Sequence, residues 1–136
     1  MLDSRVSGES GKLVSLLTEQ GQLLQAFAPG ASGSRRRFGG ALEPGCRVRV
    51  RWTVAREGGW PRLEEAVVEQ GPPSPDPLER LYATAHVVEL ARAFARQGFE
   101  EPRLYRLTVA CLEALRAAEE VDPLLRYAEL WTLRLA

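Results

Sequence analysis

The chain has 136 residues, an apolar content of 45% and 18 basic against 18 acidic side chains, so its formal net charge is zero. This length fits one ordinary domain or two small ones, and the apolar content excludes a chain that is disordered throughout. No stretch of about 18 apolar residues occurs, and no apolar leader precedes a cleavage signature. We therefore expect a soluble, cytoplasmic protein with no membrane partner.

The first half of the chain predicts β-structure. Two apolar-rich runs, residues 12–18 and 22–28, are joined by Glu19-Gln20-Gly21, a connection of hairpin size. In residues 46–55 arginine alternates with apolar side chains, which is typical of a half-buried strand with Trp52 in the core. A glycine-rich turn then leads to a strand over residues 60–69. Short strands with such turns predict a small closed or nearly closed barrel.

Positive charge is concentrated between Gly30 and Arg56. This stretch has seven arginines against one acid, Glu43, a local charge of +6. Three of the arginines follow one another in a loop with glycines on both sides, and three alternate along the predicted strand. They are Arg35, Arg36 and Arg37, then Arg47, Arg49 and Arg51. A basic loop that can follow a backbone, beside a basic strand face, is the layout expected for binding nucleic acid.

Two aromatic residues near these arginines are candidates for stacking on bases. Phe38 lies in the loop, and Trp60 follows the glycine-rich turn. Each has a structural alternative, in which the ring packs at one end of the barrel. The arginines have alternatives too: a solvated turn for the loop, and for the strand an exposed face whose arginines pair with glutamates of the neighbouring strand, namely Glu64, Glu65 or Glu69.

The segment Gly71-Pro72-Pro73-Ser74-Pro75 predicts a linker, because prolines so close together continue neither a strand nor a helix. After it the pattern becomes helical. Asp76-Pro77-Leu78-Glu79 predicts a helix start with an aspartate cap, a proline in the first turn and a capping box. We expect this helix to end at Gly98, a second to begin near Glu101-Pro102, and a third to begin at Asp122-Pro123 and run to the last residue.

Each predicted helix has an apolar stripe. The first stripe comprises Leu78, Leu81, Tyr82, Ala85, Val88, Ala91 and Ala95. The second comprises Leu104, Leu107, Thr108, Cys111, Leu112 and Leu115, and the third Leu124, Ala128, Trp131 and Leu135. No cap, glycine or proline closes the third helix, so the chain is a candidate fragment.

Nothing in the sequence indicates catalysis, a metal or a cofactor. Cys46 and Cys111 are far apart and form no C-x-x-C, so we expect two buried, reduced thiols. His86 is the one histidine, and we expect it to be a packing or capping residue rather than a base.

Several motifs together resemble the RecO family of bacterial recombination mediators. Gly8-Glu9-Ser10 is followed by Leu13-Val-Ser-Leu-Leu-Thr-Glu-Gln-Gly21, by Ala28-Pro-Gly-Ala-Ser32 and by Arg35-Arg-Arg-Phe-Gly-Gly-Ala-Leu-Glu-Pro44. Further along, Leu125-Arg-Tyr-Ala-Glu-Leu-Trp131 is similar to a helix of the family. The resemblance covers roughly residues 8–135 and rests on diffuse motifs, none of which is catalytic.

The resemblance implies an N-terminal OB barrel followed by a helical domain. It also implies binding of single- and double-stranded DNA, annealing of complementary strands, and contacts with RecR and with the tail of single-strand binding protein. The chain departs from the family in three ways. Only Met1 to Ser7 stands where the family usually has an apolar strand, and both the four-cysteine zinc module and the remaining C-terminal helices of the family are absent.

We therefore expect an α+β protein, with an OB-fold-like small β-barrel over residues 1–71 and an all-helical domain over residues 76–136. The expected function is non-catalytic: DNA binding in recombinational repair, with annealing and recombinase loading on protein-coated single strands. The expected DNA-binding residues are Arg35, Arg36, Arg37, Phe38, Arg47, Arg49 and Arg51. Two alternatives stay open: a module whose helices bind a peptide, and a non-specific RNA-binding OB protein.

Overall fold

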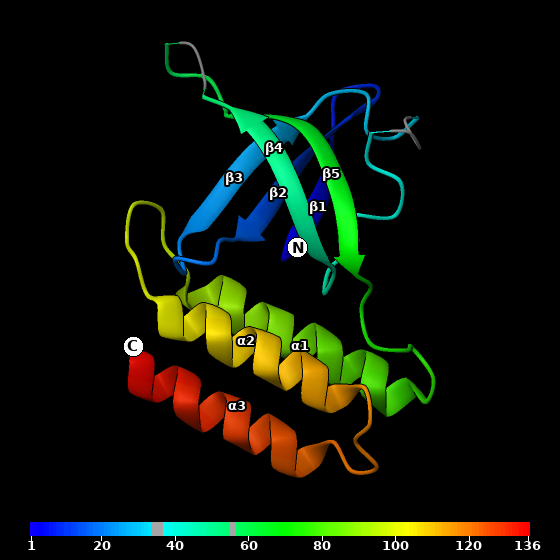
Figure 1. The fold of residues 1–136 in the computed structure, drawn as a ribbon, viewed down its shortest axis with the longest axis vertical. Coiled ribbons are helices and arrows are strands. Elements are labelled where there is room, and N and C mark those ends of the chain that lie inside the picture. The colour runs from blue at the N-terminus through cyan, green and yellow to red at the C-terminus, as the bar shows by residue number, and fades with distance from the viewer. Residues whose placement is uncertain (34–36, 55–56) are drawn as a thin grey trace. The chain divides into compact units, whose positions relative to one another are not determined.

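The computed structural model describes residues 1–33, 37–54 and 57–136 (Figure 1). Their contacts form two compact units. The sheet unit comprises Met1–Leu16 and Leu24–Gly71, and the helical unit comprises Leu17–Leu23 and Pro72–Ala136. Strands in one unit and helices in the other confirm the α+β class.

Five strands form one sheet. Their bounds are β1 Asp3–Ser7, β2 Gly11–Leu17, β3 Leu23–Ala28, β4 Arg47–Thr53 and β5 Arg62–Gln70. The order is β1-β2-β3-β5-β4, in which β1 pairs with β2 and β4 with β5 antiparallel, and β3 pairs with β5 parallel. This layout is OB-like, as expected. The first strand, which the sequence left open, is formed: its pairs run from Asp3 with Ser15 to Ser7 with Gly11.

The core of the sheet unit follows the alternation of each strand. Val14 and Leu16 of β2, and Ala26 and Ala28 of β3, are core residues two positions apart, so each pair projects to the same face of its strand. The segment between β3 and β4 adds further core residues, which are Phe38, Ala41, Leu42 and Cys46. One expectation was wrong: Trp52 is 42% exposed, because it lies at the end of β4, after a register shift between Arg51 and Trp52.

The helices are α1 Leu78–Phe94, α2 Pro102–Leu115 and α3 Asp122–Leu135. The expected aspartate cap of α1 is not formed: Pro77 is the N-cap residue, in extended conformation and without a side-chain cap bond. The helix also ends earlier than expected, at Phe94, and Gly98 lies in the following turn with a φ of 70°. The N-cap of α2 is Glu101, whose carboxylate accepts from the backbone N–H of Arg103.

The core of the helical unit uses small residues. Its buried cluster is Ala83, Val87, Cys111, Leu115 and Ala128. The expected stripe of α2 is confirmed, since four of its members are buried and the other two pack against this cluster. The stripe expected for α1 is wrong in its first half, because Leu78, Leu81 and Tyr82 are exposed. The helix has apolar residues on more than one side, so periodicity alone did not select the face built on Ala83, Val87 and Ala91.

Both cysteines are buried and neither forms a disulfide, as expected. Among the described residues, no helix combines the length and the apolar character that crossing a membrane requires.

Candidate nucleic-acid interface

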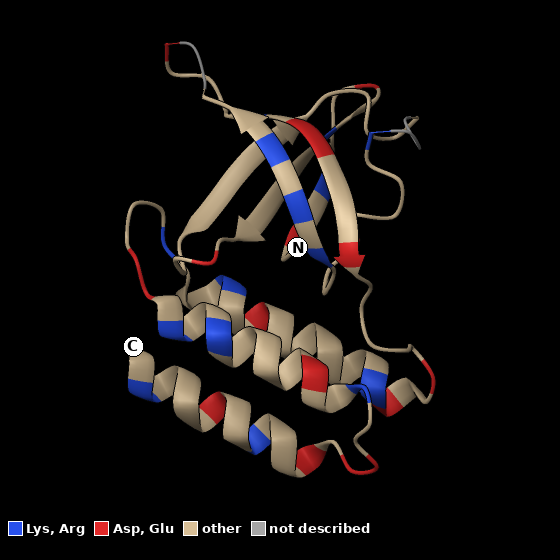
Figure 2. Cartoon of the chain, in the orientation of Figure 1, with Lys and Arg blue, Asp and Glu red and all other residues tan. Residues whose placement is uncertain are grey.

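Strand β4 presents three arginines on the outer face of the sheet. Arg47, Arg49 and Arg51 are exposed, whereas Val48 and Val50 between them pack against the core. Figure 2 shows the arginines as separate blue segments along β4. The strand therefore alternates as the sequence predicted, and its positive charge faces solvent.

Each of these arginines has a carboxylate neighbour on β5. Glu69 lies 3.1 Å from Arg49 Nε and 3.9 Å from Arg47 Nε, so two guanidinium groups share it. Glu65 lies 3.3 Å from Nη2 of Arg51. The alternative predicted for this strand, an exposed face paired with glutamates, is thus what the structure contains. It does not remove the charge from the surface, because Arg49 and Arg51 side chains remain 80% and 73% exposed.

The carboxylates reduce the net charge of this surface. Strands β4 and β5 together contain four arginines and three glutamates, including a pair between Arg62 and Glu64 at 3.4 Å. Exposed ion pairs of this kind contribute only about 0–1 kcal/mol each, so the guanidinium groups can exchange partners at small cost. The guanidinium group of arginine, which binds a carboxylate through two parallel N–H donors, binds a phosphate in the same way.

The loop between β3 and β4 differs from its prediction. Phe38 is 2% exposed and belongs to the core, so it packs rather than offering a ring to a base. Arg37 folds back: its Nη2 donates to the carbonyl of Pro29 at 2.9 Å, and its guanidinium lies 5.2 Å from the Phe38 ring centroid. The second half of this loop is therefore anchored by core packing. Arg35, Arg36 and Arg56 lie outside the described residues.

Besides Trp52, which is exposed at the end of β4, two further aromatic side chains of the sheet unit are accessible near the β4–β5 turn. Trp60 is 53% exposed and precedes β5. Phe27, on β3, is partly exposed, and its ring lies over Gly11 of β2, where a Cβ would come within 2.5 Å of ring atoms. Phe27 is not among the binding residues predicted from the sequence, although the alternation with buried Ala26 and Ala28 places it on the outer face.

Comparisons with known proteins assign both halves of the chain to one protein family. The family model "Recombination protein O N terminal" matches residues 1–71, and "Recombination protein O C terminal" matches residues 76–136. The chain belongs to the RecO family. It is similar to the DNA repair protein RecO of Myxococcus xanthus, 38% identical over 120 residues, which are 88% of this chain and 49% of the relative.

Two other RecO relatives give the same result. That of Anaeromyxobacter sp. strain K is 37% identical over 130 residues, 95% of this chain and 51% of the relative. That of Koribacter versatilis is 34% identical over 129 residues, 94% of this chain and 52% of the relative. The chain therefore spans about half the length of the curated RecO relatives that it matches.

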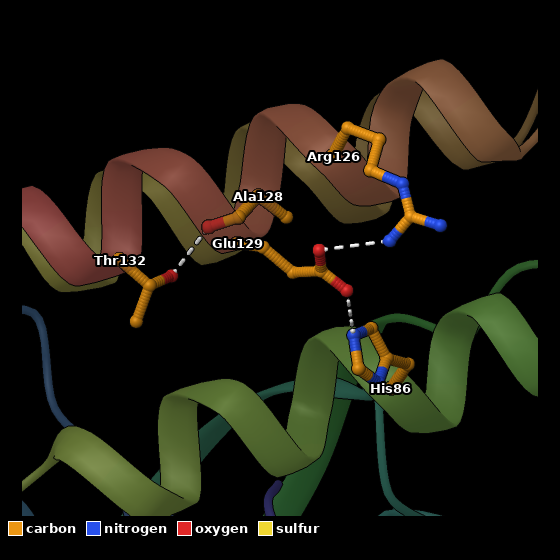
Figure 3. A network of polar contacts seen from close by, with 5 residues as sticks. All are labelled: His86, Arg126, Ala128, Glu129 and Thr132. Carbon is orange, nitrogen blue, oxygen red and sulfur yellow. Dashed lines mark hydrogen bonds and ion pairs between the residues drawn. The ribbon is translucent and has the colours of Figure 1, made fainter.

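In the helical unit of this RecO-family chain, the one histidine has a polar partner. His86 Nε2 on α1 lies 2.9 Å from Glu129 Oε1 on α3, and Arg126 donates to the other carboxylate oxygen at 3.0 Å (Figure 3). The hydrogen bond from Arg126, followed by that from His86, lowers the pKa of Glu129. His86 thus links two helices through a half-exposed hydrogen bond, rather than by the packing or capping that the sequence suggested.

No group of three or more histidine, cysteine, aspartate or glutamate side chains that could hold a metal ion occurs within residues 1–33, 37–54 and 57–136.

Proposed function

We propose that this RecO-family chain binds DNA without sequence preference through the outer face of β4, and that it acts in DNA repair by recombination. The observation that carries the proposal is the row of Arg47, Arg49 and Arg51, exposed on one face of an OB-like sheet. Its relatives in Myxococcus xanthus and Anaeromyxobacter sp. strain K are DNA repair proteins RecO, which supports the biological role.

The spacing of this row suits a nucleic-acid backbone. Alternate residues of a strand are about 6–7 Å apart, which is close to the phosphate spacing of an extended single strand. Phosphate contacts by arginine supply affinity that does not depend on sequence, and each released counterion makes binding weaker at higher salt. Three contacts predict a slope of about −2 in a plot of log K against log salt for single strands.

Strand annealing and recombinase loading are both compatible with this mode of binding. A strand that is held by its phosphates keeps its bases available for pairing, which suits annealing of complementary strands and loading of a recombinase. The family resemblance further supports RecR and the tail of single-strand binding protein as partners. The proposed role is non-catalytic, since it needs binding and release only.

Fluorescence anisotropy with a labelled single strand tests the proposal. Arg47, Arg49 and Arg51 are replaced together by glutamine, and the matched control replaces three exposed arginines of the helical unit, Arg103, Arg106 and Arg126. We expect the β4 variant to lose affinity for all sequences alike and to flatten the salt dependence, whereas the control retains both. Equal loss in the two variants would reject β4 as the site. An RNA strand of equal length serves as competitor for the RNA-binding alternative.

A second candidate function, peptide binding by the helical unit, rests on α3. This helix exposes Tyr127 by 51%, Leu130 by 57% and Trp131 by 39%, and the two aromatic rings are 6.1 Å apart. Exposed apolar surface of this kind is typical of protein interaction sites. Binding of the single-strand-binding-protein tail peptide that persists at high salt and is lost in Leu130→Asp would favour it. No change in Leu130→Asp would exclude α3.

A further inference from the structure

We infer that Phe27 is a base-stacking platform, so that the ligand of the β4 face is nucleic acid with unpaired bases. This inference rests on the proposed function, because it assumes that the arginines hold the backbone of the same strand. Of the two rings that the sequence offered for stacking, Phe38 is buried, and Trp60 is exposed but lies in the β4–β5 connection rather than on a strand, so a ring on the sheet must come from another residue. Phe27 is the ring that the sheet places on the correct face.

The register of the sheet puts Phe27 in one row with the basic strands. Phe27 is the bridge partner of Arg62 on β5, and Arg62 is in turn the partner of Thr53 on β4. Paired residues of neighbouring strands project to the same side of a sheet. Because Leu63 is buried and Arg62 is exposed, this side is the outer one.

The arginines of β4 continue the same surface. Arg51 pairs with Glu65 and Arg49 with Val67, each on the side opposite to buried Ala66. The outer face therefore carries an aromatic ring at β3, a guanidinium group at β5 and further guanidinium groups along β4. A single strand that crosses the sheet meets cations for its phosphates and a ring for a base.

The contact with Gly11 holds the ring of Phe27 over the sheet. A side chain at position 11 would come within 2.5 Å of two atoms of this ring and within 2.9 Å of the carbonyl of Ser7. The glycine thus lets the ring lie against the backbone of β2, and the backbone N–H of Phe27 is fixed by the carbonyl of Pro61 at 2.7 Å. A ring that is already positioned loses little conformational freedom when a base stacks on it.

The location matches how OB folds bind their ligands. In this fold the face of strands 2 and 3, with the β1–β2 and β4–β5 loops, contacts oligonucleotides. Phe27 lies on β3 over β2, and the carbonyl that accepts its backbone N–H belongs to Pro61, which follows Trp60 in the β4–β5 connection. Stacking of a base on an aromatic ring tolerates any sequence, because every base has a π face.

The experiment compares two oligonucleotides of equal length and charge, one of thymidine and one of abasic sites. We expect the wild-type chain to bind the thymidine strand ~5-fold or more tightly than the abasic strand, as the loss of one stacked base predicts. Phe27→Leu, which keeps an apolar cover over Gly11, should bring this ratio close to one. Phe27→Tyr should preserve the ratio, and Phe99→Leu, which changes an exposed phenylalanine of the helical unit, should leave it unchanged.

The outcomes separate this inference from the proposed function. Salt-dependent binding of both strands with a ratio that Phe27→Leu does not alter would overturn the stacking role and leave the β4 arginines in place. No binding of either strand by the wild-type chain would overturn both. Circular dichroism and thermal unfolding of Phe27→Leu show whether the sheet is intact, and Phe27→Tyr provides the answer where the leucine variant does not fold.

Discussion

Gly21 lies directly against the backbone of Glu101, so that a Cβ on Gly21 would overlap the Glu101 carbonyl. Both residues belong to the helical unit, because the turn between β2 and β3 packs with the segment that precedes α2. A second backbone contact lies next to it: the N–H of Leu23 donates to the carbonyl of Arg96 at 3.1 Å. The turn is therefore fixed by backbone contacts as well as by side chains.

Gly21→Ala should destabilise the protein strongly. The residue has a φ of 79°, which alanine adopts at a cost of about 1–2 kcal/mol, and the overlap with Glu101 adds to that cost. Gly8→Ala is the matched control, since Gly8 has a φ of 71° but nothing within 4 Å of its Cβ position. Thermal unfolding should show a larger decrease in Tm for Gly21→Ala. Equal decreases in both variants would mean that the contact with Glu101 adds nothing.

The Cys111 thiol should be unreactive in the folded protein. Burial raises the pKa of this thiol from 9.0 to about 11, so at about pH 8 very little of the reactive thiolate is present. In a Cys46→Ala background, labelling by a disulfide reagent should be slow in buffer and fast in urea. Fast labelling in buffer would contradict the burial of Cys111.

The same pKa shift affects stability at high pH. Below the unfolded pKa of 9.0 the thiol is protonated in both states, and its contribution to stability is fully present. Between 9.0 and about 11 only the unfolded state loses the proton, so stability should decrease as pH rises through this range. Cys111→Ala, compared with the wild-type chain by urea denaturation, should reduce this part of the pH dependence.

Glu129→Gln should lower the stability of the helical unit in a pH-dependent way. Because Arg126 and His86 lower the pKa of Glu129, the carboxylate stabilises the fold above its unfolded pKa of 4.5, and this effect is lost as pH falls through the folded value. The Tm difference from wild type should be largest near neutral pH and disappear in acid. Glu113→Gln is the control, since its partner Arg116, at 3.3 Å, is the C-cap residue of the same helix and links no second helix to it. If Glu113→Gln lowered Tm as much as Glu129→Gln, the contact between α1 and α3 would contribute no more to stability than a local ion pair.

Glu69→Gln should strengthen DNA binding. Its carboxylate pairs with both Arg47 and Arg49, so the substitution removes one negative charge and leaves both guanidinium groups available for phosphates. At low salt we expect ~2- to 5-fold tighter binding, with a smaller gain at high salt because the effect is electrostatic. Glu119→Gln makes the same change in net charge on an exposed residue of the helical unit and should have no such effect. Binding that does not tighten would mean that the β4 arginines are not the contact.

Local patterns predicted most of the fold. The alternation of residues 46–55 placed Arg47, Arg49 and Arg51 outside, because a strand with one buried face repeats every two residues. The apolar period of residues 104–115 selected the buried face of α2 for the same kind of reason. The first strand was not predicted, since Asp3–Ser7 has polar side chains and is fixed by pairing with β2 rather than by its own pattern.

The candidate site was harder to predict, because burial in a loop is decided by tertiary contacts. Phe38 has glycines after it and arginines before it, yet its ring fills the core of the sheet unit. Phe27 was assigned to a strand, but its position beside Arg62 depends on the parallel pairing of β3 with β5, which no local pattern contains. The partners of the arginines on β5 were predicted by residue type, and the sharing of Glu69 required the register.

The position of the Phe27 ring over Gly11 makes these two sites interdependent in evolution. An alanine at position 11 would meet two ring atoms of Phe27 at 2.5 Å and the carbonyl of Ser7 at 2.9 Å, so loss of the ring removes the two closest contacts. A small residue at position 27, in turn, uncovers the backbone that the glycine exposes. Their substitutions should therefore be non-additive, with the double variant closer to wild type in stability than the two single variants predict. Among homologous sequences, glycine at the first site and an aromatic residue at the second should be gained and lost together.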